Sequence, residues 1–149
     1  MTPTASFQDL KDASVFITGG GSGIGAALTE GFLQQGARVA FVQRSDASDF
    51  CDRMDETYGQ RPLYIPCDIT DTSALQAAIA QAATAQGAVT VLVNNAANDV
   101  RHSTQEVTEA FWDQTQAINL KAYFFACQAV IEGMQANGGG AIINFSSIS

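Results

Sequence analysis

Charged residues are scarce in this sequence, and basic residues are the scarcest among them. Only 15% of the 149 residues are charged, and 7 Lys and Arg stand against 15 Asp and Glu, for a formal net charge of -8. A nucleic-acid or anionic-membrane surface requires clustered Lys and Arg, so this balance argues against both kinds of partner. Together with 46% apolar residues, the low charge indicates that much of the surface faces other protein. Small-molecule or protein partners are therefore favoured.

Other absences narrow the class further. No apolar run approaches the roughly 20 residues of a membrane-spanning helix, and the first residues lack the basic stretch and apolar run of a secretory signal. The three cysteines, Cys51, Cys67 and Cys127, are widely spaced and odd in number, which is typical of reduced thiols in a cytoplasmic protein. No pair of them has metal-ligand spacing and His102 is the only histidine, so we expect no metal site.

Apolar runs typical of buried strands alternate with helical patterns along the whole chain. Strands are expected at residues 14–18, 38–42, 63–67, 89–93 and 141–145, and helices at residues 26–35, 47–58, 73–86 and 112–136. Strands separated by helices pair in parallel through right-handed crossovers, which predicts a doubly wound α/β sheet in one domain, residues 1–149. Pro66 fits an edge strand better than a central one, and Asp71 supplies an N-cap for the helix after it.

A glycine cluster, residues 18–25 with the sequence Thr-Gly-Gly-Gly-Ser-Gly-Ile-Gly, lies where the first strand turns into the first helix. Glycines there let the backbone approach a pyrophosphate, and the helix N-terminus offers free N–H groups and a partial positive charge. Alone the pattern is weak, because any tight turn contains glycine. Within a strand–loop–helix unit followed by a second strand, it predicts dinucleotide binding. A phosphate loop of the ATPase type is excluded, since neither Lys-Ser nor Lys-Thr follows the glycines.

Four motifs in order give the chain a resemblance to a known family. The glycine cluster has the spacing Thr-Gly-x-x-x-Gly-x-Gly, residues 94–97 read Asn-Asn-Ala-Ala, Asn119 stands in Ile-Asn-Leu-Lys, and residues 142–147 read Ile-Ile-Asn-Phe-Ser-Ser. The sequence resembles the short-chain dehydrogenase/reductase family over essentially its whole length. The resemblance implies a Rossmann-type fold and an NAD(P)-dependent oxidoreductase that transfers hydride between a nicotinamide and an alcohol or sugar hydroxyl. Ala97 departs from the family's Gly, which predicts a slightly different loop path there.

The same resemblance assigns residue roles. Ser147 and Asn119 are the expected catalytic residues, with Ser146 as the neighbouring alternative to Ser147; for Asn119 the alternative is a local cap or helix irregularity, because Asn is a poor helix-interior residue. Asp68 is expected to accept a hydrogen bond from the adenine amino group, or else to be a turn or cap residue, and Asn95 to fix the backbone beside the cofactor ribose. The full expected cofactor-binding set is Gly19, Ser22, Gly23, Ile24, Gly25, Arg44, Asp68, Ile69 and Asn95.

The slot after the second strand bears on the choice between NAD and NADP. An acidic residue there binds a ribose 2′-hydroxyl and repels a 2′-phosphate, whereas Arg attracts one. Here the strand is followed by Gln43, Arg44 and Ser45, with no carboxylate until Asp46. NADP is therefore favoured over NAD, the alternative being that Arg44 is a solvated loop residue.

The loop after the fourth strand indicates the substrate class. Residues 98–102, Asn-Asp-Val-Arg-His, border the expected substrate opening and could bond several hydroxyls of a polyol. The stretch from residue 94 to 102 is similar to sugar 1-dehydrogenases of the family, such as the xylose dehydrogenase branch. Asn98 and His102 are the expected substrate contacts, and a structural role is the alternative for His102.

The long helix expected from Trp112 to Ala136 is rich in apolar residues. Its apolar residues crowd more than one face, so we expect burial on several sides, as core and as the interface of a homo-oligomer.

The family's catalytic Tyr-x-x-x-Lys does not occur, since none of the three tyrosines has Lys four positions later. We expect the sheet to be truncated after the fifth strand, with that strand as an open apolar edge, and the chain as written to be inactive. A catalytically silent dinucleotide-binding module and a structural or dimerisation fragment remain as alternatives.

Overall fold

Five parallel strands form one sheet at the centre of the structure, a computed structural model that describes residues 5–147. Across the sheet their order is β3-β2-β1-β4-β5. The strands are β1 (Ser14–Thr18), β2 (Arg38–Gln43), β3 (Leu63–Pro66), β4 (Val91–Asn94) and β5 (Ala141–Asn144). The order reverses between β1 and β4, and in open α/β sheets the crevice at such a switch point, outside the carboxyl ends of the strands, is where ligands bind.

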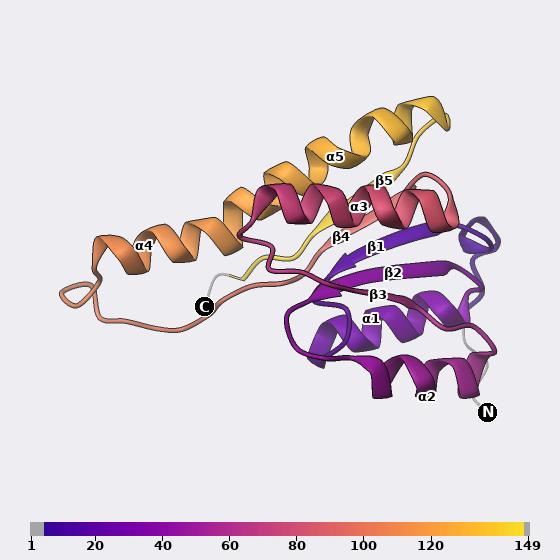
Figure 1. The fold of residues 1–149 in the computed structure, drawn as a ribbon, viewed down its shortest axis with the longest axis horizontal. Coiled ribbons are helices and arrows are strands. Elements are labelled where there is room, and N and C mark those ends of the chain that lie inside the picture. Colours follow the sequence, from indigo (N-terminus) through magenta and orange to yellow (C-terminus); the bar gives the residue numbers. More distant parts are fainter. Residues whose placement is uncertain (1–4, 148–149) are drawn as a thin grey trace.

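Helices cover both faces of the sheet. The helices are α1 (Gly23–Gln34), α2 (Ser48–Tyr58), α3 (Thr72–Gln86), α4 (Glu109–Gln116) and α5 (Ala122–Ala136). Figure 1 shows α1 and α2 on one face and α3 and α5 on the other. Alternate residues of β1 serve the two faces: Val15 and Ile17 pack with α1 and α2, whereas Phe16 packs with α3 and α5. This alternation buries β1 on both faces and confirms the predicted doubly wound α/β fold.

The expected elements are all present, and the main difference lies in the long helix predicted over residues 112–136. It begins earlier, at Glu109, and is interrupted: α4 passes through a π-helical turn, η2 (Ala117–Lys121), before α5 begins. The first helix also starts earlier than expected, at Gly23, and the fourth strand is shifted to Val91–Asn94. A short 3-10 helix, η1 (Gln8–Leu10), was not predicted.

Only one face of the long helical run is buried. In α5 this face consists of Ala122, Ala126, Val130 and Met134, spaced by one helical turn. Trp112 and Phe124 are exposed to 59% and 63%, so within the described single chain the helical run is buried on one side. The core half of that expectation is confirmed, because the inner face packs in the same cluster as α3; the subunit interface stays a prediction.

The segment after β4 and helix α4 reach away from the sheet (Figure 1), and α4 has no buried residue. At the sheet edge, β5 is exposed along its length in the described structure, as predicted for the fifth strand. No helix within residues 5–147 is both long and apolar enough to cross a membrane. Within the same residues, no group of His, Cys, Asp and Glu is arranged to hold a metal ion.

Two local predictions are confirmed at the end of β3 and the start of α3. Pro66 ends β3, which is an edge strand, where a missing N–H is tolerated. Asp71 is the N-cap of α3, and its Oδ1 accepts a hydrogen bond from the Ala74 N–H at 3.0 Å. The side chain thereby satisfies one of the first N–H groups of the helix.

We expect Asp71→Ala to lower the free energy of unfolding by about 1 kcal/mol, because α3 loses its cap while Asp71→Asn keeps an oxygen in the same place. Urea denaturation of the two variants beside the unsubstituted protein measures the difference. Equal losses in both variants would mean that the carboxylate charge, not the cap hydrogen bond, stabilises the helix.

Candidate functional site

The glycine-rich loop, residues 19–22, connects β1 to α1 at the carboxyl edge of the sheet. The loop folds back tightly, because a Cβ added to Gly25 would lie 1.8 Å from the carbonyl oxygen of Gly19. No side chain fits there, so this close approach requires glycine at position 25. Ser22 is the N-cap of α1, and its side chain makes no capping hydrogen bond in the described structure. The first N–H groups of α1 are therefore available to an anion.

Two side chains join this loop to the end of β4. The Thr18 hydroxyl accepts hydrogen bonds from the backbone N–H groups of Asn95 and Ala96, both at 3.0 Å. In return the Asn95 amide donates to the carbonyl oxygens of Thr18 and Gly19, at 3.1 and 3.3 Å. Asn95 thus holds the glycine-rich loop itself, and its expected position beside a cofactor ribose stays a prediction. Sequence reasoning missed Thr18, although a hydroxyl at the end of a buried strand signals such a role.

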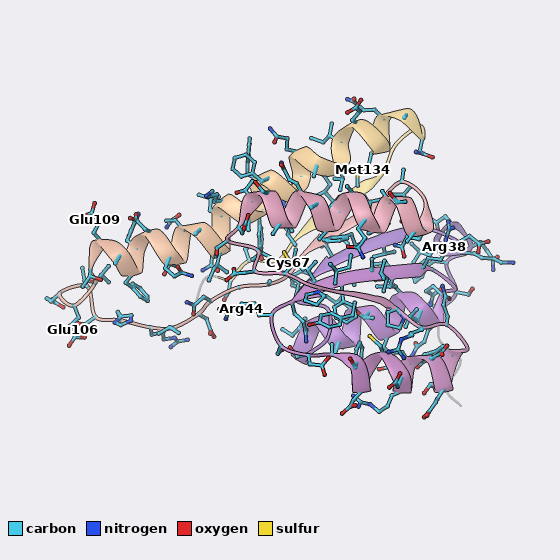
Figure 2. All side chains as sticks on the ribbon, in the orientation of Figure 1. Arg38, Arg44, Cys67, Glu106, Glu109 and Met134 are labelled. Atoms are coloured by element: carbon cyan, nitrogen blue, oxygen red, sulfur yellow. The ribbon has the colours of Figure 1, made fainter. Side chains whose placement is uncertain are left out.

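An open cleft of about 880 Å³ occupies the carboxyl edge of the sheet, within the range of small-molecule sites. Of the expected cofactor and substrate residues, those that line it are Gly19, Ser22, Arg44, Asp68, Ile69 and Asn98. The expected residues outside the lining are Gly23, Ile24, Gly25, Asn95, His102, Asn119 and Ser147. Figure 2 shows Arg44 and Cys67, both lining residues, at the opposite end of the sheet from Arg38. The cleft therefore lies at the switch point of the sheet.

Asp68 presents an ionised carboxylate to the cleft. Its Oδ1 accepts hydrogen bonds from the Thr70 backbone N–H at 3.0 Å and from the Thr70 hydroxyl at 2.8 Å. These bonds hold the pKa of the Asp68 carboxyl below its ordinary value, and the positive charge of Arg44 acts weakly in the same direction. Asp68 is thus the turn residue of the alternative interpretation and a cleft residue at once, while the adenine contact stays a prediction.

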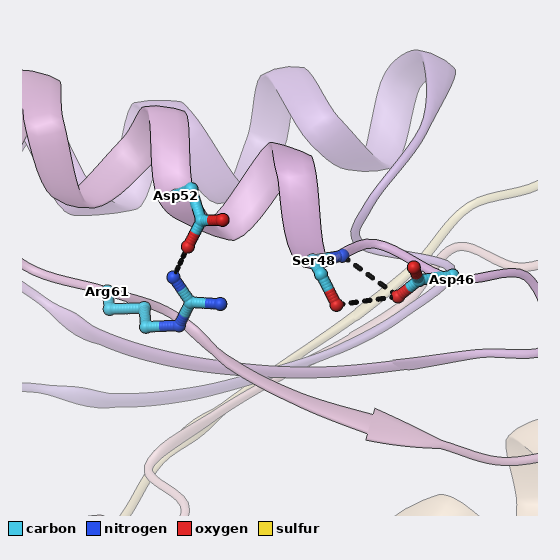
Figure 3. Close-up of polar contacts among 4 residues, drawn as sticks. All are labelled: Asp46, Ser48, Asp52 and Arg61. Atoms are coloured by element: carbon cyan, nitrogen blue, oxygen red, sulfur yellow. Dashed lines mark hydrogen bonds and ion pairs between the residues drawn. The ribbon is translucent and has the colours of Figure 1, made fainter.

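Asp46, the first carboxylate in the sequence after β2, forms hydrogen bonds with Ser48. Asp46 Oδ1 accepts hydrogen bonds from the Ser48 backbone N–H at 3.1 Å and the Ser48 hydroxyl at 2.7 Å (Figure 3). Asp46 is not among the residues that line the cleft, and the Ser48 bonds lower the pKa of its carboxyl. The cleft wall after β2 is instead Gln43, Arg44 and Ser45.

Asn119 does not line the cleft, but it binds the backbone of the loop after β4. Its Oδ1 accepts from the Asn98 backbone N–H and its Nδ2 donates to the Asn98 carbonyl oxygen, both at 2.8 Å. Asn119 lies in the π-helical turn, which agrees with the alternative interpretation of this residue as a helix irregularity. Such turns are often found at functional sites. The Asn98 side chain accepts a hydrogen bond from the Val100 N–H at 3.1 Å. Asn119 therefore holds the loop after β4, where Asn98 lines the cleft.

The other expected substrate and catalytic residues lie outside the lining of the cleft. His102 is exposed, and its ring packs against Phe111 with the ring centroids 4.0 Å apart. Ser147 is exposed beyond the end of β5, where the Phe145 N–H donates to the Asn94 carbonyl oxygen at 2.9 Å. Both assigned roles stay predictions.

None of the chain's three tyrosines is prepared as a proton acceptor. The hydrogen bond to Glu30 raises the pKa of Tyr58 above its ordinary value. Burial raises the pKa of Tyr64 and of Tyr123. A general base working near neutral pH needs a shift in the opposite direction.

Comparison with known proteins decides the family. The family described as short chain dehydrogenase matches residues 13–149. The chain belongs to the short-chain dehydrogenase family. It is 49% identical over 149 residues to a probable galactose dehydrogenase of Rhizobium meliloti, and 47% identical over 148 residues to a D-xylose 1-dehydrogenase of Caulobacter vibrioides. These alignments cover 99% and 98% of the chain, and in both cases it spans 58% of the relative's length.

Solved structures of short-chain dehydrogenases share the fold. L-Sorbose reductase from Gluconobacter frateurii, complexed with NADPH and L-sorbose, superposes with a TM-score of 0.86 at 29% identity, covering 93% of this chain and 54% of that one. The NADH-dependent reductase A1-R′, complexed with NAD, superposes with a TM-score of 0.85 at 26% identity, covering 95% and 62%. Both kinds of nicotinamide cofactor thus occur among proteins of this fold.

The close backbone contact at Gly25 generates a test. We expect Gly25→Ala to weaken dinucleotide binding at least tenfold and to destabilise the protein, because the new methyl group collides with the Gly19 carbonyl. Gly31→Ala on the same helix is the control, since a Cβ there meets nothing within 4 Å and helix propensity favours Ala. Calorimetric titration and thermal unfolding of both variants measure the effect. Similar losses at the two positions would contradict the steric argument.

Proposed function

We propose that this chain is the NAD(P)-binding Rossmann domain of an oxidoreductase that transfers hydride between a nicotinamide and a sugar or alcohol hydroxyl. The observation that carries the proposal is the cleft at the switch point of the sheet. The glycine-rich loop forms one side of it, and the loop held by Asn119 forms the other. Relatives that are sugar dehydrogenases support the substrate class, although the chain spans only 58% of their length.

NADP is the cofactor that the proposal favours over NAD. Arg44 lines the cleft directly after β2, where a 2′-phosphate of the adenosine ribose would lie. The next acid along the chain, Asp46, bonds Ser48 and does not line the cleft, so Arg44 is the only charged residue that this turn of the described chain contributes to the cleft wall. Two other groups of the site would hold the rest of the dinucleotide. They are the N–H groups at the start of α1 and, at the adenine end, the Asp68 side chain.

In the proposed reaction, Ser147 donates a hydrogen bond to the reacting oxygen of the substrate, and Asn119 positions the loop that borders it. Asn98 and His102 are the proposed contacts to sugar hydroxyls. The nicotinamide, when bound, supplies or accepts the hydride. Removing a hydroxyl proton requires a base, and none of the three tyrosines in these 149 residues has a Lys four positions later.

A catalytically silent dinucleotide-binding module is the second candidate function. It would need only the glycine-rich loop and the cleft, both of which lie within the described residues. For either function we propose a homo-oligomer that covers Trp112, Leu120, Phe124 and Ile131, the exposed apolar residues of the long helical run. The scattered free cysteines support a cytoplasmic location.

The reaction is tested in the full-length protein with NADP, D-xylose, D-galactose and a simple secondary alcohol, by the absorbance of the reduced nicotinamide. We expect turnover of at least one aldose, and we expect His102→Ala to raise KM for the aldose several-fold more than for the simple alcohol, because only the sugar offers additional hydroxyls to the loop. Equal effects on both substrates would make His102 structural. Cofactor binding without any turnover would favour the silent module.

The cofactor preference is tested by Arg44→Asp. A charge-assisted hydrogen bond contributes about 1.5–3 kcal/mol, so we expect at least tenfold weaker NADP binding with NAD binding unchanged or improved. Arg53→Asp, the same charge change on the exposed surface of α2, is the control. Calorimetric titration with both cofactors measures the ratio of dissociation constants. A preference of the unsubstituted protein for NAD would remove the proposal for Arg44.

A further inference from the structure

The side chain of Gln43 is committed to contacts within the protein. Its Oε1 accepts a hydrogen bond from the Gly21 N–H at 2.9 Å. Its Nε2 donates to the Ser45 carbonyl oxygen at 3.0 Å and to the Ser45 hydroxyl at 3.2 Å. One amide thereby joins the glycine-rich loop to the turn after β2, and both of its polar atoms are used.

Position 21 shows how closely the two segments approach. A Cβ added to Gly21 would lie 2.6 Å from Gln43 Oε1 and 2.9 Å from the Ala47 Cβ. Glycine is therefore needed at this position for the loop to meet the β2–α2 turn. The Gln43 backbone carbonyl also accepts from the Cys67 N–H at 3.1 Å, so the residue contacts three segments of the cleft wall.

Tyr64 on β3 holds the same turn from the other side. Its hydroxyl donates to the Ser45 carbonyl oxygen at 3.0 Å, the acceptor that Gln43 also uses. Its ring stacks on the buried Phe41 ring, with the centroids 5.5 Å apart and an interplanar angle of 27°. Burial raises the pKa of Tyr64, which keeps the hydroxyl protonated as a donor. Tyr64 does not line the cleft, so its effect on a ligand passes through the turn.

We propose that Gln43 and Tyr64 are positioning residues for the cofactor's adenosine end: together they fix Ser45, and with it Arg44, against the glycine-rich loop. The inference rests on the proposed binding of NADP by Arg44. A guanidinium held on a fixed turn loses less freedom on binding a phosphate than one on a mobile turn. The Ser45 hydroxyl accepts from Gln43, so its hydrogen points away from that amide and can donate to the same phosphate.

Tyr64→Phe tests the inference without altering the cleft lining, since the ring can keep its stacking on Phe41. We expect the dissociation constant for NADP to rise by about threefold to tenfold, the effect of losing one neutral hydrogen bond, and that for NAD to change less than about twofold. Tyr58→Phe is the matched control, because it removes a hydroxyl that bonds Glu30 and Gln34 and has no contact with the turn. A loss of general stability would not change the ratio of the two constants.

Gln43→Met is the second variant, and hydrogen–deuterium exchange is the second measurement, both on the full chain. We expect faster exchange across residues 44–47 in Tyr64→Phe and Gln43→Met, and at Gly21 in Gln43→Met alone, with Tyr58→Phe unchanged. If Arg44→Asp weakens NADP while Tyr64→Phe matches Tyr58→Phe in both measurements, the positioning role is overturned and the proposed cofactor stands. If Arg44→Asp leaves NADP binding unchanged, the proposed cofactor preference fails and this inference fails with it.

Discussion

The joint between the ends of β1 and β4 is the constraint on which the site depends. The sheet grows in opposite directions from these neighbouring strands, so the loops that follow them diverge and leave an opening. Backbone groups there need partners, because an unpaired buried N–H or carbonyl is costly. Thr18 and Asn95 supply four hydrogen bonds across the joint. The glycine-rich loop is therefore fixed before any ligand binds.

Elements with a strong local signal could be predicted from the sequence, and long-range contacts could not. The alternation of buried strands and helices predicted the parallel sheet, and Asp71 predicted its helix start, since both signals lie within a few residues. A helix irregularity at Asn119 was only an alternative, because the apolar pattern of residues 112–136 favoured one continuous helix. Within that turn, Asn119 makes a pair of hydrogen bonds with Asn98, which is 21 positions away.

The roles of single residues could likewise be predicted from local signals but not from long-range contacts. The sequence predicted part of the cleft lining, including Gly19, Arg44 and Asp68, because strand ends and motif order determine the edge of the sheet on which these residues lie. The expectation that Asn95 fixes backbone agrees with its hydrogen bonds to the Thr18 and Gly19 carbonyl oxygens, whereas the sequence did not predict that Gln43 joins residues 21 and 45. A charge such as that of Arg44 is visible in the sequence, but the hydrogen bonds that place its turn depend on partners 22 positions away and on a neighbouring strand.

The long helical run has an exposed apolar face and also carries a residue that contacts the cleft loop. Phe124 and Ile131 are exposed to 63% and 45%, whereas Ala126 and Val130 between them are buried with α3. A patch of this kind on a stable protein is normally covered by a partner surface. The same run carries Asn119 at the π-helical turn, and Asn119 holds the Asn98 loop by hydrogen bonds. The interruption at η2 is thus the point where the helical run that bears the apolar patch contacts the loop of the cleft, through the two hydrogen bonds between Asn119 and Asn98.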